Sequence, residues 1–156
     1  MDLLLDTNIL LFMAYEPERL SENVVALLED ADLTLCFSAA SIWEVVIKSG
    51  LNKPDFDVDP EEFRNGLFNA GLLEIPVKSE HTLIVADLPE KLHKDPFDRL
   101  IVAQAKHNKV PLITSDSKLI EFVSDYITII PNKYGLPLPR ERGYSVACRG
   151  TLNVAT

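Results

Sequence analysis

The stretch of sequence that decides the fold reads Asp95-Pro96-Phe97-Asp98-Arg99-Leu100-Ile101-Val102-Ala103-Gln104-Ala105. Asp is favoured at the N-cap of a helix and Pro at its first position, so Asp95 and Pro96 predict a helix start. Apolar residues then recur at helical spacing, and the pattern predicts a helix over 96–107. Asp98 precedes the apolar face of this helix by one turn, and its side chain is expected at the rim of a core.

Short apolar runs alternate with helical patterns along the rest of the chain. The apolar runs predict strands at about 3–5, 33–37, 72–75, 110–114 and 126–130. Helical patterns lie between them, at about 8–14, 21–28, 38–48, 60–70, 81–88, 96–107 and 118–123. Strands that alternate with helices form right-handed βαβ units. We therefore predict an α/β fold with three α/β/α layers and a mostly parallel central sheet of about five strands.

Four acidic residues stand where a strand gives way to a helix or where a helix begins: Asp6, Glu44, Asp98 and Asp116. In an open parallel sheet, ligands bind beyond the carboxyl ends of the strands, and Asp6 and Asp116 follow two predicted strands. Carboxylates are costly to crowd together unless a cation lies among them, and Mg²⁺ prefers oxygen ligands. The sequence therefore predicts a Mg²⁺ or Mn²⁺ site at which these four acids are the metal-binding and catalytic residues.

Each acid also has a plainer interpretation. Asp is favoured at N-caps, which would explain Asp6 or Asp116 taken alone. Glu44 could form a surface pair with Lys48, four residues further along its predicted helix. Four unrelated coincidences would have no reason to share one edge of a sheet. We therefore favour the metal site over the separate explanations.

Neighbours of the four acids are candidates for orienting them or for contacting a substrate: Asp95, Thr7, Asn8, Ser41, Arg99, Thr114 and Ser115. Thr7 and Asn8 follow the first acid directly and could hold it in place. Asp95 fits an N-cap followed by Pro96 and is explained well by this structural role alone. Arg99 could contact a phosphate or form an internal salt bridge.

Histidines and aromatic residues are predicted to have structural places. His81 and His107 lack the spacing of metal ligands and are expected on the surface. Trp43, Phe97 and Phe122 fit the core positions of their helices better than they fit platforms for stacking nucleotide bases.

Taken in order, the acidic motifs resemble those of PIN domains and, within that family, the VapC-type toxins of bacterial type II toxin–antitoxin pairs. The matching pieces are Asp6-Thr7-Asn8, Ser41-x-x-Glu44, His93-x-Asp95-Pro96-Phe97-Asp98-Arg99 with the six residues that follow, and Thr114-x-Asp116. The resemblance covers roughly residues 1–130 and implies a PIN-like fold. By position, it assigns the family's acidic quartet to the same four acids.

The resemblance implies a Mg²⁺- or Mn²⁺-dependent ribonuclease that hydrolyses phosphodiester bonds of single-stranded or loop RNA. It also implies a homodimer and an antitoxin partner whose tail covers the active site. One alternative is a catalytically inactive PIN-fold binding module that acts through protein or RNA partners. A phosphoacceptor receiver domain is disfavoured, because it needs a second acid paired with the one after the first strand, and Asp6 has only Asp2 nearby.

The charge of the chain bears on its partners. The formal net charge is −9, whereas proteins that bind nucleic acid non-specifically usually present a basic surface. A metal ion at the carboxylates, local basic patches and a basic partner protein would each offset this charge.

Composition and length indicate one globular domain. The chain has 156 residues, of which 47% are hydrophobic and 25% charged. Residues 1–130 are predicted to form the nuclease domain, and 131–156 a Pro-, Gly- and Arg-containing tail that is poorly ordered or lies over the surface. No secretory signal or membrane span is expected, and Cys36 and Cys148 are too few for a disulfide framework. The expected location is the cytoplasm.

Overall fold

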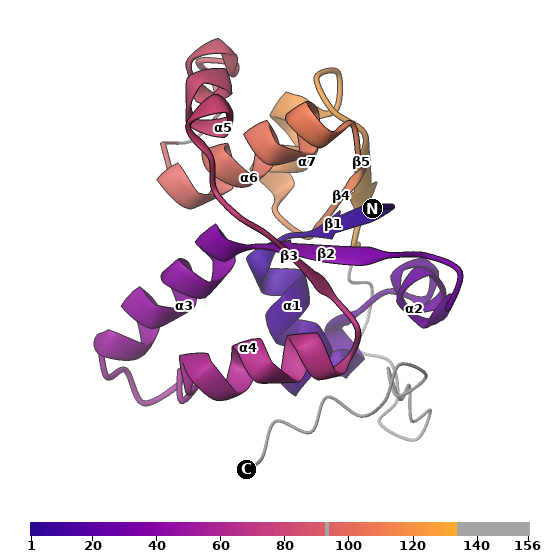
Figure 1. The fold of residues 1–156 in the computed structure, drawn as a ribbon, viewed down its shortest axis with the longest axis vertical. Helices are drawn as coiled ribbons and strands as arrows, with labels where there is room; N and C mark the ends of the chain where they lie inside the picture. The colour runs from indigo at the N-terminus through magenta and orange to yellow at the C-terminus, as the bar shows by residue number, and fades with distance from the viewer. Residues whose placement is uncertain (93, 134–156) are drawn as a thin grey trace.

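The computed structural model describes residues 1–92 and 94–133, which form a five-stranded sheet with helices on both faces (Figure 1). The strands are β1 (Leu3–Leu5), β2 (Leu35–Ser38), β3 (Leu73–Ile75), β4 (Leu112–Thr114) and β5 (Ile129–Pro131). Their order is β3-β2-β1-β4-β5, and every pairing is parallel. The predicted α/β class and parallel sheet are confirmed.

Helices fill the connections between the strands. They are α1 (Thr7–Tyr15), α2 (Glu22–Glu29), α3 (Ala39–Gly50), α4 (Pro60–Asn69), α5 (Ser79–Ile84), α6 (Pro96–Asn108) and α7 (Ser117–Val123), with 3₁₀ turns η1 (Pro17–Arg19) and η2 (Val85–Asp87). Helices α1, α2 and α4 lie on one face of the sheet, and α6 and α7 lie on the other (Figure 1). The side chains of each group pack in a core cluster of their own. The predicted three-layer arrangement follows. In the part of the chain that the structure describes, no helix is long and apolar enough to cross a membrane.

The central strand, β1, contributes side chains to the core clusters on both faces of the sheet. Leu3 and Leu5 of β1 belong to the first core cluster, whereas Leu4 belongs to the second. Successive strand residues point to opposite faces of a sheet, so a strand covered on both sides must be apolar throughout. Cys36 of β2 lies in the second cluster as a buried free thiol.

The last described residues, just after β5, are hydrogen-bonded to the rest of the fold. Asn132, just after β5, is buried, and its side chain accepts a hydrogen bond from Ser21 N at 2.7 Å and donates one to Arg19 O at 3.0 Å. Strand β5 begins later than predicted, because Tyr126 N and Ile127 N both bond to Val123 O and continue the turn after α7. Residues 134–156 lie outside the described residues, so the predicted tail stays a prediction, as does the domain boundary at 130.

Trp43 does not lie in the core, contrary to the prediction. It is 58% exposed, and its ring meets that of Phe97 edge-on at a centroid distance of 4.9 Å. The apolar run of α3 extends around most of the helix, and only part of the helix can face the core. Val45 is buried on that part, while Trp43 and Val46 face outward. Phe97 and Phe122 are partly buried.

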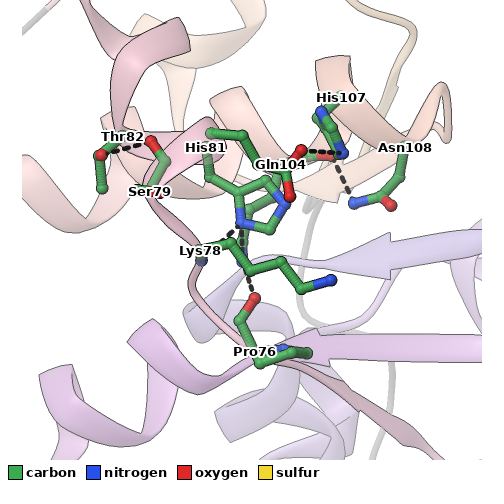
Figure 2. A network of polar contacts seen from close by, with 9 residues as sticks. Pro76, Lys78, Ser79, His81, Thr82, Gln104, His107 and Asn108 are labelled. Carbon is green, nitrogen blue, oxygen red and sulfur yellow. Dashed lines mark hydrogen bonds and ion pairs between the residues drawn. The ribbon is translucent and has the colours of Figure 1, made fainter.

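His81 is buried, so the predicted surface location was wrong for this residue. Its Nδ1 accepts a hydrogen bond from Lys78 N at 3.0 Å and caps the first turn of α5 (Figure 2). Gln104 Nε2 lies 3.4 Å from the same nitrogen, and the ring packs edge-on against His107 at 4.8 Å. The cap of α5 and the contacts with α6 hold the His81 ring inside the fold. Neither interaction can be predicted from the spacing of the histidines in the sequence. His107 itself is exposed, as predicted.

Stability should decrease in mildly acidic solution because of His81. Burial, assisted by His107, lowers the pKa of His81 below 6.5, although Glu80 opposes this shift. The unfolded chain therefore binds more protons at this site, and its contribution to stability is lost as pH falls below 6.5. Urea unfolding at pH 7.5 and 5.5 should show a larger loss for wild type than for His81→Gln, whose amide oxygen can accept the same hydrogen bond at either pH. Equal losses in the two proteins would contradict this role.

Candidate active site

Asp6 stands at the centre of the site, directly after β1. It is buried, and it caps α1 by accepting a hydrogen bond at Oδ1 from Thr7 N at 2.8 Å. Its other oxygen, Oδ2, accepts a hydrogen bond from Thr114 Oγ1 at 2.7 Å. Thr114 ends β4, which pairs with β1, so the parallel register brings the two side chains together across 108 positions of sequence. Asp6 is therefore an N-cap and also a carboxylate fixed at the sheet edge.

Asp116 is attached to the same point. Its backbone N donates to Thr114 Oγ1 at 3.0 Å, and its Oδ1 caps α7 by accepting from Lys118 N at 2.8 Å and Leu119 N at 3.2 Å. The plainer interpretation of Asp6 and Asp116 as N-caps is thus confirmed for both. It does not compete with a further role, because a carboxylate has about four acceptor sites and can cap a helix and bind a cation together.

Helix α3 joins the site through a hydroxyl pair. Thr7 Oγ1 donates to Ser41 Oγ at 2.9 Å, and both residues are buried. Ser41 lies on α3 one turn before Glu44, so this bond fixes α3 against the start of α1. Of the predicted orienting residues, Thr7, Ser41 and Thr114 are thereby brought together beside Asp6.

Glu44 fits both of its sequence interpretations. It forms the i,i+4 ion pair with Lys48, with Oε2 3.0 Å from Nζ, and it is nevertheless buried. Its other oxygen, Oε1, is shielded from solvent and accepts no hydrogen bond within the described ranges 1–92 and 94–133. Because buried carboxylate oxygens are normally hydrogen-bonded, this acceptor is available to a ligand.

The start of α6 supplies the fourth acid. Asp95 caps the helix, and its Oδ1 accepts from Phe97 N at 2.9 Å and from Asp98 N at 3.3 Å. Asp98 lies in the first turn and is partly buried. Arg99, a candidate for phosphate contact, donates from Nη1 to Leu92 O at 3.2 Å. At least part of its hydrogen-bonding capacity is therefore used within the fold.

The remaining candidates, Asn8 and Ser115, line two grooves of the surface. Asn8 is exposed and lines, with Lys48, a groove of about 440 Å³ between α1 and the segment 55–58. Ser115 lines a second groove, of about 520 Å³, on the α7 side of α1. Phe12 and Arg19 border both grooves, with the guanidinium 4.3 Å from the ring centroid. Sequence reasoning missed these two residues, because an apolar residue of α1 and an arginine of η1 give no motif.

The electrostatics connect all four acids. Burial raises the pKa of Asp6 to about 6, with Glu44 and Asp116 adding to the rise, although hydrogen bonds from Thr114 and Thr7 oppose it. Burial also raises the pKa of Asp98 to about 8, and Asp6, Asp95, Asp116 and Glu44 each add to this shift. The acids therefore lie close enough to repel one another, and their environment favours a compensating positive charge.

Carboxylate oxygens form a donor set that suits Mg²⁺ or Mn²⁺. Glu44 Oε1, which is buried and accepts no hydrogen bond from the described residues, fits a cation placed among the acids, as do the raised pKa values of Asp6 and Asp98. Within residues 1–92 and 94–133, no three His, Cys, Asp or Glu side chains lie close enough together to hold a metal ion as they stand. Like charges separate in the absence of a cation, so the acids would have to move closer to bind one.

Comparison with known proteins gives a family match over most of the chain. The family model described as "PIN domain" matches residues 3–123, and PIN domains typically bind divalent metal ions. No curated protein sequence matches the chain.

Solved structures share the fold at low sequence identity. The chain resembles VapBC2 from Rickettsia felis bound to promoter DNA (18% identity, TM-score 0.62, covering 85% of this chain and 100% of that one). It also resembles DNA-bound VapBC from Salmonella typhimurium (15%, 0.63, covering 85% and 99%) and a toxin–antitoxin complex from Klebsiella pneumoniae (17%, 0.60, covering 86% and 100%).

Removing the charge of Asp98 should stabilise the metal-free protein. The folded-state pKa of about 8 lies above the ordinary value of 3.8, so ionisation of Asp98 opposes folding increasingly as pH rises from about 4 to 8. Asp98→Asn should therefore raise the unfolding free energy at pH 7.5 by on the order of 1 kcal/mol after allowance for solvent screening. Chemical denaturation in EDTA measures this difference. A variant less stable than wild type would show that Asp98 is compensated within the fold.

Proposed function

This chain belongs to the PIN-domain family, and we propose that it is a Mg²⁺- or Mn²⁺-dependent endoribonuclease, the toxin of a toxin–antitoxin pair acting in the cytoplasm. The observation that carries the proposal is the mutual repulsion of Asp6, Glu44, Asp98 and Asp116 at one edge of the sheet. Keeping these acids ionised at neutral pH is costly without a cation, and a cation supported by oxygen ligands suits phosphodiester hydrolysis.

The four acids would hold the cation, each in a different way. Asp6 is the fixed ligand, because Thr7 N and Thr114 Oγ1 restrain both of its oxygens. Asp116 would contribute its carboxylate from the start of α7, where Oδ1 caps the helix. Glu44 would contribute Oε1, which accepts no hydrogen bond within residues 1–92 and 94–133. In the metal-free protein, Asp98 keeps its proton up to a pH of about 8 and would release it to become a ligand.

A bound divalent ion supplies two things: a water of lowered pKa and charge neutralisation at the phosphate. In the proposed reaction, water attacks phosphorus in line and the 3′ oxygen leaves. The products are a 5′ phosphate and a 3′ hydroxyl. No side-chain nucleophile is needed, since the acids serve to bind, orient and neutralise.

An antitoxin partner is the second part of the proposal. The similar solved structures are toxin–antitoxin complexes, which supports such a partner without identifying it. The groove beside Asn8 and Lys48 is lined by the aromatic side chains of Tyr15 and Phe56 and also by Asp57. Apolar walls with acidic groups suit a segment that carries both apolar and basic residues. A basic antitoxin segment would also offset the net charge of −9.

A homodimer is the third part. Helix α3 presents an exposed apolar stripe of Trp43, Val46, Ile47 and, at its end, Leu51, at spacings of three and four residues. Such a face on a soluble domain is a frequent site of protein association. We assign this stripe to contact with a second copy of the chain.

Replacing Asp6 with Asn should abolish RNA cleavage. The substitution removes the charge of the fixed ligand, and we expect a loss of roughly 100-fold or more in a cleavage assay with Mg²⁺ or Mn²⁺ on a pool of structured RNAs. Asp59→Asn is the matched control, because Asp59 also caps a helix (α4) but is not one of the four acids. The control should cut like wild type, and EDTA should stop both.

Cleavage by Asp6→Asn at the wild-type rate would overturn the site assignment. Wild-type protein that binds RNA or an antitoxin but never cuts, with Mg²⁺ or with Mn²⁺, would favour the inactive binding module instead.

Replacing Trp43 with Glu should yield a monomer. The side chain is largely exposed, so the charge should leave the fold intact while disfavouring burial of the stripe against a second copy. Light scattering coupled to size exclusion should give twice the chain mass for wild type and the single-chain mass for the variant. Circular dichroism checks the fold. A monomeric wild type, or a variant that stays dimeric, would refute this use of the stripe.

A further inference from the structure

Lys48 brings a positive charge to the solvent-facing edge of the acidic site. Its Nζ lies 3.0 Å from Glu44 Oε2, one helical turn away on α3. The Lys48 side chain is 39% exposed and that of Glu44 only 11%, so the ammonium approaches a largely buried acid from the solvent side. This geometry differs from an exposed i,i+4 pair, where both partners are hydrated and the interaction contributes little.

The ion pair satisfies only half of the carboxylate. Oε2 is on Lys48, while Oε1 is buried and accepts no hydrogen bond in the described part of the chain. Leaving a buried acceptor unsatisfied is costly, and here the atom belongs to an acid that also repels Asp6 and Asp98. The single charge of the ammonium therefore compensates Glu44 without satisfying it.

An open groove lies beside the Lys48 ammonium. Lys48 lines the groove of about 440 Å³ with Asn8, Tyr15 and Phe56. A long flexible lysine side chain can move its charged end into this open groove without any backbone rearrangement.

We propose that Lys48 is the resident counter-ion of the metal centre, exchanged for the divalent cation when the cation binds. The inference rests on the proposed metal-dependent function. In the metal-free protein, the ammonium stabilises Glu44; in the metal-bound protein, the cation takes over this role and repels the ammonium. An interaction that exists mainly in the metal-free state lowers metal affinity by the same factor by which it stabilises that state.

The proposed exchange and a purely orienting role predict opposite effects of removing Lys48 on metal affinity. If Lys48 merely held Glu44 in position for the metal, its removal would weaken metal binding. If Lys48 competes with the metal, its removal should destabilise the metal-free protein and tighten metal binding. Affinity and stability in the absence of metal therefore separate the two roles, and neither requires an RNA substrate.

The experiment is calorimetric titration of Mn²⁺ into EDTA-stripped, dialysed protein, with thermal unfolding recorded before and after saturation. Lys48→Met should bind Mn²⁺ roughly three- to tenfold more tightly than wild type and unfold at a lower temperature without metal. Lys48→Gln serves as a second neutral variant. Lys48→Arg keeps the charge and should stay within about twofold of wild-type affinity.

Lys118→Met is the matched control, because it removes a surface lysine two positions after Asp116 and should change the affinity by less than about twofold. Unchanged or weaker Mn²⁺ binding by Lys48→Met and Lys48→Gln would overturn the exchange and leave the nuclease proposal standing. Equal tightening by Lys118→Met would also overturn it, since a general charge effect would then suffice. No Mn²⁺ binding by any of the proteins, wild type included, would overturn the metal-dependent function itself.

Discussion

The hydrogen bond from Thr114 Oγ1 to Asp6 Oδ2 is the contact on which the site depends. It exists because β1 and β4 are parallel neighbours whose carboxyl ends meet at one edge. The same hydroxyl accepts from Asp116 N, so one threonine sets two of the four acids relative to each other. The Thr7–Ser41 bond extends the arrangement to α3 and thus to Glu44. The parallel sheet brings these elements to one edge, and a small network of hydroxyl groups then holds the acids there.

This arrangement costs electrostatic free energy, and that cost indicates a site for binding a cation. Burial and mutual repulsion raise the pKa values of Asp6 and Asp98, so the fold keeps carboxylates where their ionised form is unfavourable. Lys48 pairs with one oxygen of Glu44, and the other oxygen accepts no hydrogen bond in the part of the chain that the structure describes. A site that is expensive to keep charged without a cation is one that gains most from binding a cation.

Local chemistry made much of the fold predictable. The start of α6 was correct because N-capping by Asp95 and the fixed backbone of Pro96 act within a few residues. The four acids could be proposed together because Asp6, Asp98 and Asp116 lie at a strand end or a helix start, and Glu44 lies in the second turn of α3. The bonds of Asp6 and Asp116 to Thr114, and of Thr7 to Ser41, could not be deduced, since they depend on which strands and helices become neighbours. Trp43 and His81 were misplaced for the same reason: exposure is decided by packing, and not by the residue type or its spacing.

The end groups of the RNA products test the central claim most directly. Fragments produced by the wild-type protein with Mn²⁺ would be treated with a 5′-phosphate-dependent exonuclease and examined for cyclic phosphates by mass spectrometry. Hydrolysis at the four acids predicts 5′ phosphates and 3′ hydroxyls, formed only when the metal is present. Fragments that end in 2′,3′-cyclic phosphates and form equally well in EDTA would contradict it, because the RNA's own 2′ hydroxyl would then be the nucleophile.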